Sequence, residues 1–364
     1  MQKDLLKRCG DKIEVLYQPR RGVSATTAWQ RLQEELALVT GTEAEQRFLN
    51  AAELATVCRR HNWPVWLVGS GPSSILLFLL ELSQVDPIEN GLYFERFFFP
   101  HLGQTADFTL VTPETTFNAV DKTIAAVGAN KWLHLQTATQ LQALPAFVED
   151  DLRKQGKAVD WGREPTNWPV LWDSADPYLV RTCEPDIYQL DCPEFYQAKQ
   201  AWQPGSPSQL AAITAIALQS ALDEVELFTW AQERETPAEL LRPWLRESGG
   251  ILIFQEQVMA SLHEIGGFSR ESAYRALKDI TTEKTLETDA YERKFLDGAM
   301  ERGHAPQAAW LAFDAMREAA ATCVCKAHHV AQAITTYRAL WLRSVQPTTY
   351  RKFIPAKSPD YDDD

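Results

Sequence analysis

The sequence predicts an α+β protein that is predominantly helical. Apolar residues recur every three or four positions through residues 29–39 and 45–61, the spacing of helices that bury one face. Two shorter apolar segments, 65–68 and 106–111, are instead typical of buried strands. From residue 194 onward the pattern is helical, so the predicted strands belong to the N-terminal part of the chain.

The composition is that of a globular protein. The chain has 364 residues, enough for two or three domains with their own cores, and 45% of the residues are hydrophobic. The longest apolar run, 75–80, is far shorter than the roughly 18 residues that a membrane span needs. The opening segment 1–11 is charged and lacks the apolar stretch of a secretory signal. We therefore expect a cytoplasmic protein with no membrane partner.

The charge is negative overall but unevenly distributed. A net charge of −13 argues against a protein that coats nucleic acid without specificity, because phosphate binding is driven by lysine and arginine. Residues 319–359 nevertheless contain no Asp or Glu. The basic residues of this segment are Lys326, Arg338, Arg343, Arg351, Lys352 and Lys357. Charge alone is equally compatible with one defined phosphate site and with a solvated helical face.

Turns and periodicity predict the order of the remaining elements. A tight turn at 69–74 leads into the apolar helix 75–82, residues 121–158 have the pattern of two helices, and 159–186 form an irregular connection rich in Trp, Pro and Asp. We then expect helices at 208–231, 238–247, 251–265, 269–280, 287–302, 305–321 and 326–345. The end of the chain, 358–364, is expected to be disordered.

The segment 324–347, VCKAHHVAQAITTYRALWLRSVQP, is the most informative part of the chain. Lys326 and His328 stand just ahead of an aromatic-rich helical pattern. Without a gap, the segment resembles the motif F-N-K-S-H-S-x-A-Y-x-x-x-x-Y-Q-T-x-W-L-K-x-x-x-P in the fingers domain of bacterial replicative DNA polymerases, the C family of DNA polymerase III alpha subunits. The matched positions are Lys326, His328, Ala331, Tyr337, Trp341, Leu342 and Pro347, and Arg343 replaces the family's Lys.

Other segments resemble the same family in the same order. Residues 90–100 are similar to L-L-F-E-R-F-L-N-P, and 250–268 (GILIFQEQVMASLHEIGGF) to G-I-I-L-Y-Q-E-Q-V-M-x-I-x-x-x-x-x-G-Y. Residues 63–87 resemble the turn, helix and D-P of P-V-G-P-G-R-G-S-x-x-G-S, and 187–190 resemble the start of the fingers, V-F-Q-L. The resemblance covers about 29–110 and 187–350.

The resemblance implies a truncated and degenerate polymerase core. It predicts a small nucleotidyltransferase-like palm remnant at 1–118, and short thumb-like helices with an irregular Trp/Pro-rich connection at 119–186. A helical fingers-like domain would follow at 187–350, and 351–364 would be a disordered tail. The family's N-terminal phosphoesterase-like domain and the modules beyond the fingers have no counterpart here.

The metal-binding residues are where the chain departs from the family. Nucleotidyl transfer needs two Mg²⁺ ions, which the family holds with three aspartates. The resemblance places Asp107 at the first, and Thr109 at the second. The third belongs to a K-F-D-F-L-G strand without an evident match, and Asp160 is a weak candidate for it. Mg²⁺ remains possible at Asp107, but one carboxylate does not position two ions, so we do not expect DNA synthesis by this chain alone.

Part of a phosphate-binding surface is expected to survive. Backbone N–H groups of a glycine turn, and cations near a helix start, both suit phosphate. The candidate nucleotide- or phosphate-binding residues are Gly69, Ser70, Gly71, Lys278, Lys326, Arg338 and Arg343. If group-transfer chemistry persists, the candidate catalytic residues are Asp107, Lys326 and His328.

Two other patterns have structural alternatives. Cys323, Cys325, His328 and His329 have the look of a zinc cluster, but the C-x-C spacing is shorter than structural zinc sites use and the stretch coincides with a helix start, so we expect no zinc. The tryptophans of 159–186 could stack on bases, but they more often pack a linker onto a core.

Three functions follow from these residues. The first is a degenerate polymerase core that binds nucleotides or DNA, primer–template or single-stranded, beside a replication complex. The second is a repurposed bacterial or phage enzyme that modifies DNA bases by group transfer in the old polymerase pocket. The third is a split polymerase subunit, in which a partner chain supplies the missing palm strands. Each predicts location in the cytoplasm of a bacterial or phage-infected cell.

Overall fold

The computed structural model describes residues 2–17, 23–102, 104–157, 159, 187–190, 204–218, 239–282 and 285–354. Several sequence-based expectations fall outside these residues. They are the weak carboxylate candidate Asp160, the tryptophans of the irregular connection, most of the predicted helix 208–231 beyond residue 218, and the tail from residue 355. None of the described helices is long and apolar enough to cross a lipid bilayer.

A three-stranded sheet stands at the centre of the N-terminal part. Its order is β1 (Trp66–Val68), β2 (Phe108–Thr112) and β3 (Leu133–Thr137). β1 pairs with β2 antiparallel, and β2 pairs with β3 parallel, through the crossover helix α5 (Glu114–Ala126). The α+β fold class, predominantly helical with a small sheet, is therefore confirmed.

The prediction of two helices across 121–158 is wrong in its middle. The segment contains the end of α5, the strand β3, and α6 (Gln140–Lys154). β3 reads LHLQT and buries only its first residue well, so it has neither a long apolar run nor a clean alternation. What makes it a strand is its pairing with β2, from Phe108 opposite Leu133 to Thr112 opposite Thr137. The domain boundaries themselves stay a prediction.

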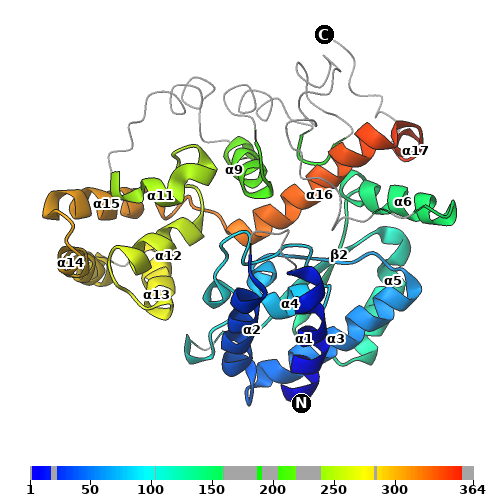
Figure 1. Ribbon diagram of the computed structural model, residues 1–364, viewed down its shortest axis with the longest axis horizontal. Coiled ribbons are helices and arrows are strands. Elements are labelled where there is room, and N and C mark those ends of the chain that lie inside the picture. Colours follow the sequence, from blue (N-terminus) through cyan, green and yellow to red (C-terminus); the bar gives the residue numbers. More distant parts are fainter. Residues whose placement is uncertain are drawn as a thin grey trace, which may run out of the picture.

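Helices cover both faces of the sheet. On one face lie α1 (Gln2–Leu16), α2 (Ala25–Val39), α3 (Glu43–His61) and α4 (Ile75–Leu79), which share one core (Figure 1). Within this core Phe108 of β2 packs edge-on against Phe48 and Trp132, with ring centroids 5.5 and 5.2 Å away. On the other face, Ala143 of α6 packs with Trp66, Val68 and Val111.

The C-terminal part is helical. A separate core is formed by α11 (Arg242–Leu245), α12 (Gln255–Glu264), α13 (Arg270–Thr281), α14 (Thr285–Glu301) and α15 (Pro306–Ala319), with short 3₁₀ turns at Glu239–Leu241 and Arg246–Ser248. These helices occupy one side of the molecule in Figure 1, away from the sheet. The predicted helices of this region are confirmed, with bounds that shift by a few residues.

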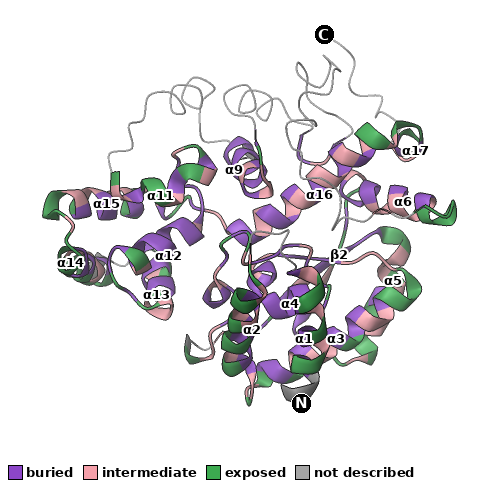
Figure 2. Cartoon of the chain, in the orientation of Figure 1, coloured by how far each residue is buried: buried purple, intermediate pink, exposed green. Residues whose placement is uncertain are grey.

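The helix α16 (Lys326–Val345) connects the two parts. It packs against α9 (Pro207–Leu218), α6 and α17 (Pro347–Arg351), and its first half also lies near β1 and the 3₁₀ turn Gly71–Ser73. Buried residues run along its length (Figure 2). The structure therefore inserts the segment with the most informative sequence motif between the sheet and the helical part.

Candidate functional site

The turn after β1 and the start of α16 meet directly. The backbone N–H of Gly69 donates to Nδ1 of His328 at 3.0 Å, across 259 positions of sequence. The Cys325 thiol lies 3.9 Å from the Gly69 carbonyl oxygen. Because Nδ1 accepts this bond, the proton of the neutral imidazole lies on Nε2. The structure therefore brings the candidate phosphate-binding residue Gly69 into contact with the candidate catalytic residue His328.

The buried carboxylate of Glu35 binds the end of the Gly69 turn and the start of α4. Glu35 of α2 accepts from the Ser74 hydroxyl at 2.8 Å and from the N–H of Ile75 at 3.0 Å, at the start of α4. Arg31, one helical turn earlier, donates to Glu35 at 2.8 Å and to the Ser73 carbonyl at 3.1 Å. Burial raises the pKa of Glu35, while the Arg31 guanidinium and the donated hydrogen bonds oppose that shift.

Glycine is required in the turn for two different reasons. Gly69 has a φ of +74°, a conformation that side chains with a Cβ disfavour. At Gly71 an added Cβ would lie 2.6 Å from the Leu67 side chain, which would have to shift to make room for it. These positions hold the Gly69 N–H where His328 reaches it.

A second carboxylate occupies the N-terminus of α16. Glu256 of α12 is buried, and its Oε2 accepts from the N–H of Lys326 at 2.8 Å. Its Oε1 lies 3.4 Å from the N–H of Ala327. The segment before α16 is paired beside α12 through the bridge between Phe254 and Val324, which places Glu256 under the helix start. The N–H groups that would attract a phosphate therefore already have an anionic acceptor.

Lys326 points into the protein interior. Its Nζ donates to the Asn90 carbonyl at 2.5 Å and to Oε2 of Glu247 at 2.7 Å. Its side chain is 5% exposed. A phosphate at this ammonium would have to compete with Glu247, so the proposed roles of Lys326 in phosphate binding and catalysis stay predictions.

The other predicted cations are dispersed. Lys278 is exposed on α13, where its Nζ lies 5.6 Å from the centre of the Tyr274 ring. Arg338 and Arg343 lie in the second half of α16, and Arg338 lines a cavity near α6. Lys352 pairs with Asp151 at 3.0 Å. As far as the structure describes the stretch without acidic residues, to residue 354, its cations do not form a single exposed face.

Asp107 lies at the same end of the sheet as the Gly69 turn. It precedes β2, and its carboxylate is 43% exposed and pairs with Arg47 of α3. The Thr105 hydroxyl donates to its other oxygen at 2.9 Å. Thr109 pairs across the sheet with Val68 on one side and His134 on the other.

Strand alternation places two of these side chains on one face. Phe108 and its partner Leu133 belong to the buried core, so Thr109 and its partner His134 project from the opposite face. Asp107 precedes the strand, and its ion pair with Arg47 directs its carboxylate towards α3, which packs on the core side of the sheet. Within the part of the chain that the structure describes, no three His, Cys, Asp or Glu side chains gather as metal ligands.

The cysteines near α16 are held as neutral thiols. Burial raises the pKa of Cys323 and of Cys325 to about 12, and the nearby Glu256 adds to the shift. The Cys323 thiol faces the Leu252 carbonyl, 3.7 Å away. A zinc ligand or nucleophile must be a thiolate, which these surroundings disfavour.

His329 makes the stability of this region sensitive to acid. Burial and the neighbouring His328 lower the pKa of His329 from 6.5 to about 4. The unfolded chain therefore binds a proton that the folded chain rejects, and stability is lost as the pH falls from about 6.5 towards 4. We expect His329→Asn to reduce the loss of unfolding free energy between pH 7.5 and pH 5, measured by urea denaturation. An unchanged pH dependence would contradict this assignment.

Comparison with known proteins identifies the family. The family described as bacterial DNA polymerase III alpha NTPase domain matches residues 3–144, and the one described as bacterial DNA polymerase III alpha subunit finger domain matches residues 150–303. The chain belongs to the bacterial DNA polymerase III alpha subunits. The family expected from the sequence motifs is thereby confirmed.

Curated alpha subunits show the same relationship. The chain is 24% identical to the DNA polymerase III subunit alpha of Caulobacter vibrioides over 65% of this chain and 20% of that protein. It is 23% identical to that of Pasteurella multocida over 69% of this chain and 22% of that protein. A Buchnera aphidicola subunit is 31% identical over 30% of this chain. The chain thus spans about a fifth of the length of the first two relatives.

β3 is the strand that sequence analysis missed. In its pairing with β2, His134 lies opposite Thr109, while Leu133 belongs to the core and Leu135 packs against it. Sequence analysis also gave no role to Glu35, Arg47 and Glu256, which contact the Gly69 turn, Asp107 and the start of α16 in the structure.

Proposed function

We propose that this chain binds DNA or nucleotides as a polymerase-derived protein and does not polymerise DNA by itself. The observation that carries the proposal is the composition of the expected metal site. The resemblance places Asp107 at the first carboxylate position and Thr109 at the second, and the residue opposite Thr109 on β3 is His134, not a carboxylate. Two-metal nucleotidyl transfer relies on carboxylates that bridge and orient both ions.

The partner of Asp107 supports the same conclusion. Arg47 forms an ion pair with the carboxylate, and its guanidinium lies 5.9 Å from the centre of the Trp132 ring. A divalent cation at Asp107 would have to replace this contact and would meet the positive charge of Arg47. The fixed cation instead suits contact with a nucleic-acid phosphate, which needs no metal.

Primer extension and DNA binding test the two halves of the proposal separately. With Mg²⁺ and all four deoxynucleoside triphosphates, we expect no extension of a labelled primer–template. In fluorescence anisotropy, we expect the same DNA to bind with an affinity that falls steeply as salt rises. Lys278→Ala should reduce the slope of log affinity against log salt by about 1, if Lys278 contacts one phosphate.

The control is Lys122→Ala, which removes an equally exposed lysine from α5. This variant should bind DNA as the unaltered protein does. Extension that disappears in Asp107→Asn would overturn the claim that polymerisation is lost. Absence of salt-sensitive binding to any DNA would overturn the claim of nucleic-acid binding.

One observation favours a second candidate, the split polymerase. Among the described residues, no strand pairs with the outer edge of β3. An open edge can accept a strand from another chain, and such a strand could bring carboxylates to the face of Asp107. Mg²⁺-dependent extension by a mixture with a candidate partner, lost in Asp107→Asn, would support this function. If the mixture shows no extension, that partner does not complete a polymerase with this chain, and binding of DNA or nucleotides without polymerisation is the function supported.

A further inference from the structure

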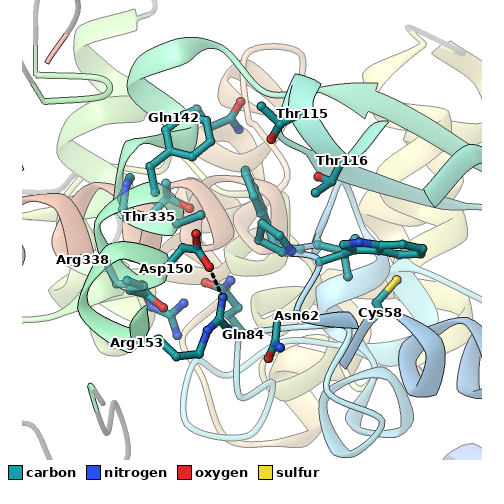
Figure 3. Close-up of a pocket in the computed structure, with 18 of the residues that line it drawn as sticks. Cys58, Asn62, Gln84, Thr115, Thr116, Gln142, Asp150, Arg153, Thr335 and Arg338 are labelled. Atoms are coloured by element: carbon teal, nitrogen blue, oxygen red, sulfur yellow. Dashed lines mark hydrogen bonds and ion pairs between the residues drawn. The ribbon is translucent and has the colours of Figure 1, made fainter. Parts of the chain in front are cut away.

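A cavity of about 410 Å³ lies where α3, α5, α6 and α16 meet the start of β1. Figure 3 shows polar side chains from all four helices around it, among them Asn62, Thr116, Gln142 and Arg338. Small-molecule sites usually have volumes of about 300–1,000 Å³. The cavity is thus large enough for a ligand the size of a nucleotide.

Sheet topology separates this cavity from the Gly69 turn. β1 and β2 are antiparallel, with Trp66 opposite Val111 and Val68 opposite Thr109. The cavity is lined by Pro64 and Trp66 at the start of β1. Gly69 and Asp107 lie at the other end of the same strands. A ligand in the cavity would therefore occupy a different site from the candidate site around Gly69 and Asp107.

Aromatic side chains provide flat walls. Trp63 and Phe147 are half-buried and Trp66 is nearly buried, and all three line the cavity. Trp63 already stacks on the ring of His61 with centroids 4.7 Å apart. Aromatic side chains stack on nucleobases with little dependence on sequence, because every base has a π-face. The walls therefore suit a planar heterocycle.

Side-chain amides provide the polar groups that a base edge requires. Gln84, Asn62 and Gln142 all line the cavity. Gln142 is held by a capping box in which its Oε1 accepts from the Thr139 N–H, which makes its Nε2 the group offered as a donor. Asn62 has a φ of +53° at the end of α3. Amides that combine a donor with an acceptor match the edges of purines and pyrimidines.

Three arginines and two carboxylates, Glu149 and Asp150, complete the lining. Arg338 is contributed by α16, and burial lowers the pKa of its guanidinium. Arg59 and Arg153 stand at the exposed rim, paired with Glu81 and Asp150. Exposed pairs of this kind contribute little to stability, so either arginine can exchange its carboxylate for a phosphate. The rim thus offers cations where a phosphate would meet solvent.

We propose that this cavity binds a single nucleotide, with the base between the aromatic side chains and the phosphate at the rim arginines. The amides of Gln84 and Gln142 recognise the base edge, and Arg59 and Arg153 hold the phosphate. The same chemistry is offered by a free mononucleotide and by one unpaired nucleotide of a DNA strand. The site does not depend on the proposed function, because it lies at the opposite end of the sheet.

Calorimetric titration of the whole chain tests the ligand class. The probes are deoxyadenosine monophosphate, deoxyadenosine, inorganic phosphate and an eight-residue oligodeoxyadenylate. We expect the monophosphate to bind more tightly than deoxyadenosine, and phosphate alone to bind weakest. Tighter binding of the oligonucleotide than of the monophosphate would assign the site to a strand, and the reverse order would assign it to a free nucleotide. The proposal is overturned if inorganic phosphate is the only probe that binds, or if no probe binds.

Two variants locate the binding. Ala146→Trp fills the cavity from α6, and Arg153→Glu reverses a charge at the rim, where the Arg153 side chain is 48% exposed. Each variant should raise the dissociation constant of the monophosphate at least about tenfold, a large effect for the loss of one contact. The matched control is Arg275→Glu, because Arg275 is 54% exposed and also pairs with a carboxylate of its own helix, Glu271.

Binding of the monophosphate and binding of primer–template DNA are measured separately in each variant. Ala146→Trp should retain the salt-dependent binding of primer–template DNA, because that binding is assigned to other residues. If Ala146→Trp lowers the melting temperature, the surface variant Arg153→Glu decides the result. Unchanged monophosphate affinity in Arg153→Glu, and in a folded Ala146→Trp, would overturn the inference even if DNA binding by the unaltered protein is found.

Discussion

Glu35→Ala is expected to lower the free energy of unfolding by about 3–5 kcal/mol, the usual effect of removing one partner of a buried ion pair. The variant would leave the Arg31 guanidinium, only 12% exposed, without its carboxylate. It would also leave the Ser74 hydroxyl and the N–H of Ile75 without their acceptor at the start of α4. Each unsatisfied buried donor adds about 1–3 kcal/mol of desolvation cost, which the partial collapse of the site reduces.

Guanidinium denaturation of the variant and the unaltered protein measures this effect. Glu35→Gln retains acceptor atoms but not the charge, so we expect it to lose less stability than Glu35→Ala. The matched control is Glu34→Ala, since Glu34 is the neighbouring residue of the same helix and is 46% exposed. A change within about 0.5 kcal/mol is expected for that surface position. Equal stabilities of the Glu34 and Glu35 variants would contradict the role assigned to Glu35.

Glu256→Ala is expected to cost about 2–3 kcal/mol, because two backbone N–H groups at the start of α16 would lose a buried, charged acceptor. The contacts concerned are those to Lys326 at 2.8 Å and to Ala327 at 3.4 Å. The N-terminal partial charge of α16 would also lose its nearest anion. Since His328 follows one residue later, the loosened turn should weaken its bond with Gly69.

Hydrogen exchange at the amides of residues 326–330 checks the local part of this expectation, and denaturation checks the total. Faster exchange confined to the first turn of α16 is the expected pattern. Glu264→Ala serves as the comparison, because Glu264 is the last residue of the same helix α12 and is 57% exposed. If the first turn of α16 exchanges at the unaltered rate in Glu256→Ala, the carboxylate is not what holds the helix start.

Local pattern predicted the helices well where one face is buried. The expected bounds of α16, 326–345, are those observed, because apolar residues at helical spacing face α9, α6 and the sheet. The strand β2 was also predicted, since four of its five residues are buried in the middle of the sheet. β3 was not, because an edge strand with a half-exposed sequence takes its conformation from backbone pairing rather than from an apolar pattern.

The site depended on sequence and on tertiary structure in different ways. Sequence motifs assigned the family. They also matched Asp107 and Thr109 to the family's metal-binding strand, and indicated the Gly69 turn and His328 as candidate site residues. They could not show that Glu256 already accepts the N–H groups of the α16 N-terminus, or that Glu247 binds the Lys326 ammonium. A motif records which residue types are present, whereas the availability of a charge depends on what stands within hydrogen-bond distance of it.

The amino-acid sequence by itself determined the polymerase family, most helical elements and the presence of Thr109 where the resemblance expects an aspartate, since residue types and periodicity are properties of the chain alone. Only the tertiary structure decided that His134 stands beside Thr109, that Lys326 is internally paired, and that α6 and α16 enclose a cavity. The physical reason is separation along the chain. The contact of Gly69 with His328 spans 259 positions and that of Lys326 with Asn90 spans 236, distances over which no local pattern specifies which atoms meet.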